Sequence, residues 1–255
     1  MHCGGRLSTL RNMKMPDKNK TVNKEYWENN IEGFAGFYDV QSEETFNSGC
    51  WGFDRFYRKA ILPLEKKWML RRHRYVSSYI ANHVSTGMKA ADIGCGSGVY
   101  VKAMISQGAF VYALDYANSA ISLTTRNLTA RELNAASIQL FDITQNHIPP
   151  VDVALAIGVL PYISDLDRFL DNILPYATRV LFNYLDRKNI FNFVRRHLTF
   201  LDVRNYSYHT SAEVTRKTRE RGFKVVNVSK LATGFIVEIE KAFAVRSDDM
   251  SKPPA

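Results

Sequence analysis

The chain has 255 residues, of which 45% are hydrophobic and 23% are charged, and its formal net charge is +9 at pH 7. This length is sufficient for one well-buried α/β domain with an appendage, but it is short for two full domains. No run of 18 or more apolar residues occurs, which excludes a membrane-spanning helix, and we expect no secretory signal because the basic N-terminus has no apolar core.

Positive charge is concentrated in two segments. Residues 1–24 hold six Lys or Arg against one Asp, and residues 55–75 hold eight against Glu65 alone. Such segments are suited to an anionic substrate, to RNA or to a membrane surface, on which the protein would lie peripherally. The alternative, which we favour, is a solvated helix face whose apolar side packs on the body. We expect no DNA partner.

The N-terminal part of the chain is expected to be helical. Residues 1–24 are interpreted as a disordered basic leader, and residues 25–86 as a helical appendage. Apolar and aromatic residues follow Tyr26 at spacings of three and four, as in an amphipathic helix. A longer helical stretch is expected at about 53–85 and ends at Gly87.

Strands and helices alternate from residue 87 to residue 243. The seven expected strands are apolar runs at 89–94, 110–115, 137–142, 151–158, 178–185, 224–231 and 234–243. The expected helices cover 99–107, 118–134, 165–177 and 210–223, with caps at Asp165 and Thr210. Alternation of this kind predicts a parallel sheet with helices on both faces. The last two strands are too close together for a crossover and should be antiparallel, and residues 244–255 are interpreted as a frayed tail.

The segment "KAADIGCGSGVYVKAM" (89–104) joins the first expected strand to a helix through three alternating glycines. Glycines at such a junction permit unusual backbone angles and let a ligand lie against bare backbone at the helix N-terminus. The dinucleotide fingerprint G-x-G-x-x-G would need glycine where the chain has Val99. Asp92 beside the turn would repel a pyrophosphate but suits a cationic amine. The pattern therefore favours a nucleoside cofactor over a dinucleotide.

The motif D-x-G-x-G-x-G at 92–98 resembles the first motif of class I S-adenosylmethionine-dependent methyltransferases, and the resemblance extends over residues 87–243. Asp115 stands where that family ends strand two with an acidic residue for the ribose hydroxyls. Asp142 stands where the family often has an acidic residue near the adenine amino group. The segment "IGVLPYI" (157–163) occupies the place under the methionine portion of the cofactor.

The resemblance implies an α/β fold: a Rossmann-like, seven-stranded, mostly parallel sheet with helices on both faces, an antiparallel last strand and an N-terminal helical lid. It implies S-adenosylmethionine as the cofactor and S-adenosylhomocysteine as the product. The implied cofactor-binding residues are Asp92, Gly94, Cys95, Gly96, Gly98, Asp115, Tyr116, Asp142, Ile143 and Gly158. Each of these signals also has a purely structural explanation. The glycines could form only a tight turn, Asp115 could be a helix cap, and Asp142 could close an Asx-turn.

In this family the sulfonium already activates the methyl group, so catalysis consists largely of holding the acceptor in line and excluding water. A hydroxyl acceptor also needs its proton removed. His209, just before the last helix, is a candidate general base, with a surface or capping histidine as the alternative. Tyr162, after strand four, is the second catalytic candidate. With Tyr184 it is more readily a pocket wall, because a phenol keeps its proton at neutral pH.

The aromatic residues of the N-terminal segment are suited to a lid over the cofactor, as the resemblance implies; they are Tyr26, Trp27, Phe34, Phe37 and Tyr38. The alternative is that they only dock the appendage on the edge of the sheet, and both can hold. The cysteines Cys3, Cys50 and Cys95 are an odd number without metal-type spacing, and the six histidines form no cluster. We therefore expect reduced thiols, no metal and a cytoplasmic location.

The acceptor is constrained by the segment after strand four. Family members that methylate adenine or glutamine nitrogens usually have (Asp/Asn)-Pro-Pro-(Tyr/Phe) there, whereas Val159 and Leu160 precede Pro161 in this chain. The stretches "GFDRFYRK" and "YHTSAEV…RGF" resemble magnesium-protoporphyrin O-methyltransferases and some glycan-cluster sugar methyltransferases. We therefore expect O-methylation of a small-molecule, glycan or lipid-linked acceptor by direct in-line methyl transfer.

Three alternatives stay open at this point. One is an RNA or protein methyltransferase guided by the basic segments. Another is an NAD(P)-dependent oxidoreductase, against which Val99 argues. The third is a catalytically silent member that binds the cofactor as a structural or regulatory partner. The acceptor's identity and the oligomeric state are left open as well.

Overall fold

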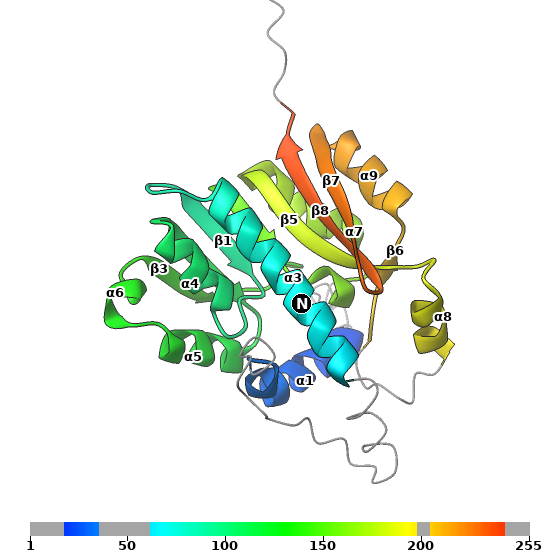
Figure 1. Ribbon diagram of the computed structural model, residues 1–255, viewed down its shortest axis with the longest axis horizontal. Helices are drawn as coiled ribbons and strands as arrows, with labels where there is room; N and C mark the ends of the chain where they lie inside the picture. Colours follow the sequence, from blue (N-terminus) through cyan, green and yellow to red (C-terminus); the bar gives the residue numbers. More distant parts are fainter. Residues whose placement is uncertain (1–17, 36–61, 198–204, 243–255) are drawn as a thin grey trace, which may run out of the picture.

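The structure is a computed structural model that describes residues 18–35, 62–197 and 205–242 (Figure 1). The expected frayed tail and most of the expected basic leader lie outside these residues. No helix among the described residues has the length and apolar character needed to cross a membrane.

An eight-stranded sheet forms the centre of the molecule, with strand order β3-β2-β1-β4-β5-β8-β7 and β6 paired with β5 off this path. The strands are β1 Lys89–Ile93, β2 Phe110–Asp115, β3 Ala136–Leu140, β4 Val151–Ala156, β5 Ala177–Asp186, β6 Tyr208–His209, β7 Phe223–Leu231 and β8 Gly234–Lys241. All pairings are parallel except those of β8, which is antiparallel to both β5 and β7. The expected Rossmann-like topology with an antiparallel last strand is confirmed.

The sheet has one strand more than the seven expected. The additional strand is β6, whose two residues pair in parallel with the end of β5. A two-residue strand carries no detectable hydropathy period, so only its tertiary pairing reveals it.

Helices cover both faces of the sheet, as expected (Figure 1). The helices of the described residues are α1 Lys18–Ala35, α3 Leu62–His83, α4 Val99–Ser106, α5 Asn118–Asn127, α6 Ala130–Leu133, α7 Leu166–Ile173, α8 Ile190–His197 and α9 Ser211–Glu220. Short 3-10 turns lie at η2 Leu160–Tyr162 and η3 Leu174–Tyr176. Asp165 and Thr210 cap α7 and α9, and each accepts a hydrogen bond from the backbone three residues later.

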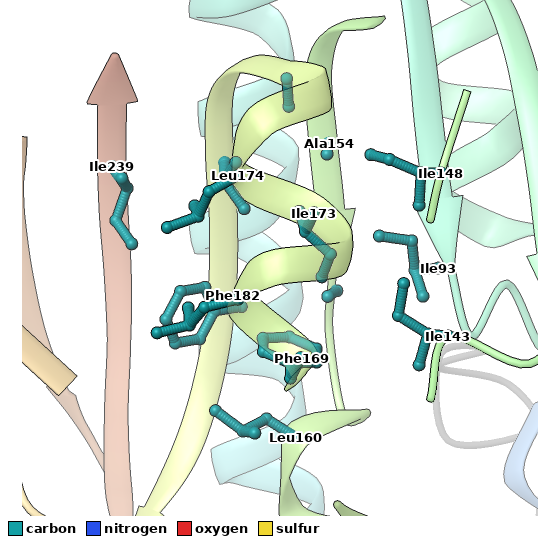
Figure 2. Packing of buried hydrophobic residues seen from close by; sticks show 14 of the residues in the cluster. Ile93, Ile143, Ile148, Ala154, Leu160, Phe169, Ile173, Leu174, Phe182 and Ile239 are labelled. Atoms are coloured by element: carbon teal, nitrogen blue, oxygen red, sulfur yellow. The ribbon is translucent and has the colours of Figure 1, made fainter. Parts of the chain in front are cut away.

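Two hydrophobic cores follow from the alternation of side chains along the strands. On one face, Ile93 and Phe182 belong to the core that contains α7, whereas Ala90 and Leu181 face α3 and α4 on the other. Figure 2 shows side chains of α7 lying among those of the strands. The four buried apolar residues of α7 are Leu166, Phe169, Leu170 and Ile173, at the spacing of one helical face. Burial of each such side chain stabilises the fold by about 1.5–3 kcal/mol.

Element boundaries differ most from expectation in two places. The helix α1 begins at Lys18, so its first turns lie within the expected leader. The single helix expected at 118–134 is two helices, because Leu128 is extended and Thr129 starts α6 with a capping box to Glu132. The Thr-x-x-Glu pattern was present in the sequence and signals this new start.

Candidate functional site

The glycine turn follows the end of β1 and leads directly into α4. Gly94, Gly96 and Gly98 have φ values of 72°, 56° and 79°, in the left-handed region that favours glycine. The backbone N–H groups of Gly94 and Cys95 donate to Leu114 O at 2.7 and 3.2 Å, which ties the turn to β2. A Cβ atom at Gly94 would lie 2.5 Å from Val159 Cγ2, so a side chain there would force Val159 to shift. The turn therefore presents bare backbone to the pocket beside it.

Asp115 ends β2 directly beside the turn. Its Oδ2 accepts a hydrogen bond from Gly96 N at 3.1 Å, and its Oδ1 accepts one from Ala117 N at 3.0 Å. Burial raises the pKa of this carboxyl, and the backbone N–H groups of Ala117, Gly96 and Tyr116 oppose that rise. The contact with Ala117 is the local one that the helix-cap reading requires. The contact with Gly96 and the position in the pocket wall go beyond a cap.

Asp92 precedes the turn on β1 and is only 1% exposed. Within the described part of the chain, neither of its carboxyl oxygens has a hydrogen-bond partner. Burial, with a smaller contribution from the charge of Asp115, raises the pKa of Asp92 to about 8. A buried acid without a partner is costly when ionised, so the site is poised for a positive charge nearby.

The loops after β3 and β4 complete the floor of the pocket. Asp142 Oδ1 accepts hydrogen bonds from Thr144 N at 3.0 Å and Thr144 Oγ1 at 2.7 Å, which is the Asx-turn of the simpler reading. Asp142 nevertheless lines the pocket together with Ile143. Gly158, with φ of 82°, lines it from the β4 side and donates its N–H to Asn183 Oδ1 at 2.6 Å.

The helix α1 covers the pocket, which Asn23, Trp27 and Ile31 line from above. Glu28 accepts hydrogen bonds from Asn118 N at 2.8 Å and Ser119 N at 2.9 Å, so α1 supplies the cap that the N-terminus of α5 otherwise lacks. Although burial opposes it, these bonds from Ser119 and Asn118 lower the pKa of Glu28.

A second pair of contacts fixes the other end of α1. Asn23 Nδ2 donates to Asn205 O at 3.0 Å, and Asn205 N donates to Asn23 Oδ1 at 2.9 Å. Trp27 meets Tyr162 edge to face, with ring centroids 5.5 Å apart. The predicted lid position of this helix agrees with these contacts for Trp27, whereas the side chain of Phe34, and Phe37 and Tyr38, lie outside what the structure describes.

Arg72, from α3, is the only cationic side chain among the described residues that line the pocket. Its Nη1 lies 3.8 Å from the position that a Cβ atom would occupy at Gly158. The sequence placed Arg72 in a basic run without distinguishing it from its neighbours. Arg71 and Arg74 are exposed, as expected for a solvated helix face. Arg72 differs from them only in its position around the helix axis, which turns its side chain towards the pocket.

The structure brings together most of the predicted site residues. Those that line the pocket are Gly94, Cys95, Gly96, Asp115, Tyr116, Asp142, Ile143, Gly158 and Tyr162. Asp92 and Gly98 support the turn from behind rather than lining the pocket.

The structure does not bring His209 to the pocket. The ring is buried with its Nδ1 3.9 Å from Glu213 Oε2, and burial lowers its pKa, which favours the neutral ring. The proposed general base therefore lies behind the wall that Ile163 contributes. Strand β6, which contains His209, holds it there, and no pattern in the sequence indicates that strand.

The parallel sheet, the glycine turn over β1 and the acidic end of β2 define a Rossmann-like domain that binds a nucleoside at the carboxyl ends of its strands. Residues 91–179 match a family model described as a methyltransferase domain. No curated protein sequence matches the chain. This match and the fold confirm the expected resemblance to class I S-adenosylmethionine-dependent methyltransferases, and residues 91–179 carry the methyltransferase domain. The match argues against the NAD(P)-dependent oxidoreductase alternative.

Solved structures agree with this fold. Magnesium protoporphyrin IX methyltransferase from Synechocystis PCC 6803 with bound S-adenosylhomocysteine is 17% identical, with a TM-score of 0.65, and the match covers 88% of this chain and all of that one. Its complex with S-adenosylmethionine gives a TM-score of 0.63 at 16% identity over 90% of this chain and all of that one. The [4+2]-cyclase SpnF gives 0.53 at 13% identity, over 67% of this chain and 81% of that one. Since one fold carries different reactions, the reaction must be argued from the site.

Proposed function

We propose that this protein transfers a methyl group from S-adenosylmethionine, by direct in-line transfer, to a hydroxyl oxygen of a small-molecule, glycan or lipid-linked acceptor. The observation that carries the proposal is the roof over the pocket. Trp27 of α1 meets Tyr162 in the wall of the pocket that the glycine turn also lines, so the pocket is walled in part by aromatic rings and covered by a helix. A covered, aromatic-walled pocket suits a small group that enters it, and it excludes water from the transfer.

The residues present fit S-adenosylmethionine. Its sulfonium supplies an electrophilic methyl group. Asp115 would accept the ribose hydroxyls, because its carboxylate is fixed by Gly96 N and Ala117 N. The bare backbone of the glycine turn allows close approach, and Arg72 beside Gly158 would hold the methionine carboxylate. Asp92 behind the turn offers a carboxyl group to the positive end.

Oxygen rather than nitrogen is favoured by the residues around η2. Val159 lines the pocket, and buried Leu160 and Pro161 follow it, so none of these three residues offers a side-chain amide or carboxylate to hold a planar amino group. Of the two catalytic candidates, only Tyr162 reaches the pocket, where we assign it the positioning of the acceptor. The name of the Synechocystis neighbour, a methyltransferase of magnesium protoporphyrin IX, supports a small-molecule acceptor.

The experiment is a binding measurement followed by a transfer screen. Calorimetry with S-adenosylhomocysteine should give tight binding to the wild type and a loss of about 2 kcal/mol, or roughly 30-fold, for Asp115→Ala, because charge-assisted hydrogen bonds are lost. The matched control is Asp152→Ala, an exposed carboxylate at the start of β4 that accepts a bond from Lys89 N. Equal affinities for the two variants would remove Asp115 from the site.

Labelled S-adenosylmethionine and fractionated cell extract then identify the acceptor. The proposal predicts label in a small-molecule, glycan or lipid-linked product that is stable to conditions that hydrolyse esters, because methylation of a hydroxyl gives an ether. Label in RNA or protein, with affinity that falls steeply as salt rises, would overturn it in favour of the RNA or protein alternative. Cofactor binding without label in any fraction would favour the catalytically silent alternative.

A further inference from the structure

The helix α8 exposes an unusual apolar face. Its four large apolar side chains, Ile190, Phe191, Phe193 and Val194, are 66%, 63%, 50% and 46% exposed. The spacing i, i+1, i+3, i+4 places them along one face of the helix. The other exposed large apolar side chains of the described chain are spread over several elements, at most two on any one of them. Exposed apolar residues gathered on one element mark an interaction site.

The side of α8 that faces the protein is polar. Asn192 is fully buried, and its Nδ2 donates to Asp186 O at 2.8 Å and to Thr233 O at 2.6 Å. Asn189 Oδ1 accepts from Phe191 N at 2.9 Å and starts the helix. A helix on a protein surface normally buries its apolar side, and α8 does the reverse. The apolar residues are therefore not needed to attach α8 to the domain.

Positive charge surrounds this apolar face. Residues 187–197 contain four Lys or Arg and no Asp or Glu. Arg195 lies over the ring of Tyr206, with 5.0 Å to the centroid, and Arg196 lies 5.4 Å from the ring centroid of Tyr208 and donates to Arg187 O at 3.2 Å. These contacts hold guanidinium groups at the edge of the apolar face.

The position of α8 relates it to the pocket. It follows the end of β5, and Figure 1 shows it at the same end of the sheet as α1. Arg195 lies over the ring of Tyr206, and the centroid of that ring is 5.5 Å from the ring centroid of Tyr162, which lines the pocket. A surface that binds α8 would therefore lie close to the side of the pocket that Tyr162 lines.

We propose that α8 docks on the surface of an anionic lipid bilayer, with Ile190, Phe191, Phe193 and Val194 in the interfacial region and Arg187, Lys188 and Arg196 facing lipid phosphates. An apolar face bordered by cations is the pattern of helices that lie in a membrane interface. A second copy of this chain fits less well, because a two-fold contact through α8 would bring two cationic borders together. This docking goes beyond the proposed methyl transfer and does not depend on it.

The test is sedimentation of the full chain with vesicles of phosphatidylcholine alone or mixed equally with phosphatidylglycerol. The wild type should bind the mixed vesicles and not the neutral ones. Phe191→Ser with Phe193→Ser should weaken that binding at least about tenfold, because less apolar area enters the interface. The matched control, Val226→Ser with Val228→Ser, removes two exposed apolar side chains from β7 and should bind as the wild type does.

Further measurements separate the possible failures. Lys188→Glu should weaken binding to mixed vesicles, and hydrogen exchange should show protection at 187–197 when vesicles are added. The proposal would be overturned if the wild type did not bind the mixed vesicles, or if the Phe191/Phe193 variant bound them as well as the wild type does. It would also be overturned if analytical ultracentrifugation showed a wild-type dimer that this variant dissociates. Circular dichroism of the variant should be unchanged, which shows that the fold is intact. Its affinity for S-adenosylhomocysteine should also be unchanged, so that membrane docking is tested separately from the proposed function.

Discussion

Arg72 places a permanent positive charge in a pocket wall that otherwise carries the carboxyl groups of Asp115 and Asp142. The two acids lie at the ends of β2 and β3, on the side where the nucleoside is expected. Arg72 lies near Gly158, below the expected methionine portion. The acidic residues thus lie where the nucleoside is expected, and the arginine lies where the carboxylate of the methionine portion is expected.

Substitution of Arg72 tests this arrangement. Arg72→Met should weaken S-adenosylhomocysteine binding by about 2 kcal/mol, because a charge-assisted hydrogen bond to the carboxylate is lost. The affinity for a decarboxylated analogue should not change. Arg71→Met, an exposed neighbour on the same helix, is the control and should leave both affinities as they are. Equal losses for the two ligands would show that Arg72 acts on the fold rather than on the carboxylate.

Asp92 makes the stability of the protein depend on pH. In the folded state burial raises the pKa of this carboxyl to about 8, against 3.8 for an aspartate side chain in water. Folding therefore favours the protonated form, and this contribution to stability is complete below about pH 4 and is lost as pH rises towards 8, by at most about 1.4 kcal/mol per pH unit. Thermal unfolding should show Asp92→Asn equal to the wild type at the acidic end and more stable at pH 8. Asp152→Asn is the control, and parallel curves for wild type and Asp92→Asn would contradict the assignment.

At the scale of elements, α1 and α5 depend on each other. The N-terminus of α5 begins just after Asp115, and its first backbone N–H groups are satisfied by Glu28 of α1. A charged cap at a helix N-terminus contributes through hydrogen bonds and through the helix dipole. The same carboxylate therefore holds the roof in place and completes the helix that follows the ribose-binding strand.

Glu28→Gln should cost about 1 kcal/mol of unfolding free energy, because the charged cap is lost. Hydrogen exchange over residues 22–31 should become faster, and the affinity for S-adenosylhomocysteine should fall. Glu25→Gln, an exposed residue one turn earlier on α1, serves as the control. If exchange in α1 is unchanged by Glu28→Gln, the roof is held by other contacts, such as those of Asn23.

At the scale of the whole molecule, the presence and direction of the long strands could be predicted from sequence. Buried parallel strands appear as short apolar runs such as 151–156, and the short β7–β8 connection requires an antiparallel pair. The glycine turn and Asp115 could be found because the ligand site of this fold lies at fixed strand ends.

Other features depend on contacts between distant segments. Asn23 pairs with Asn205, 182 residues away, and no local pattern announces that bond. Strand β6 is too short for a period, and its pairing withdraws His209 from the pocket. The helix α8 packs on the domain through the polar side chain of Asn192, whereas a surface helix normally packs through its apolar face. Its position could therefore not be inferred from hydropathy.

The helix over the pocket also has a kinetic consequence. Because Trp27 and Ile31 form part of the wall, we expect exchange of spent for fresh cofactor to require α1 to move. Such a movement would break the Glu28 cap and the paired amides of Asn23. The rate at which α1 opens, rather than the rate of methyl transfer, would then limit the turnover rate.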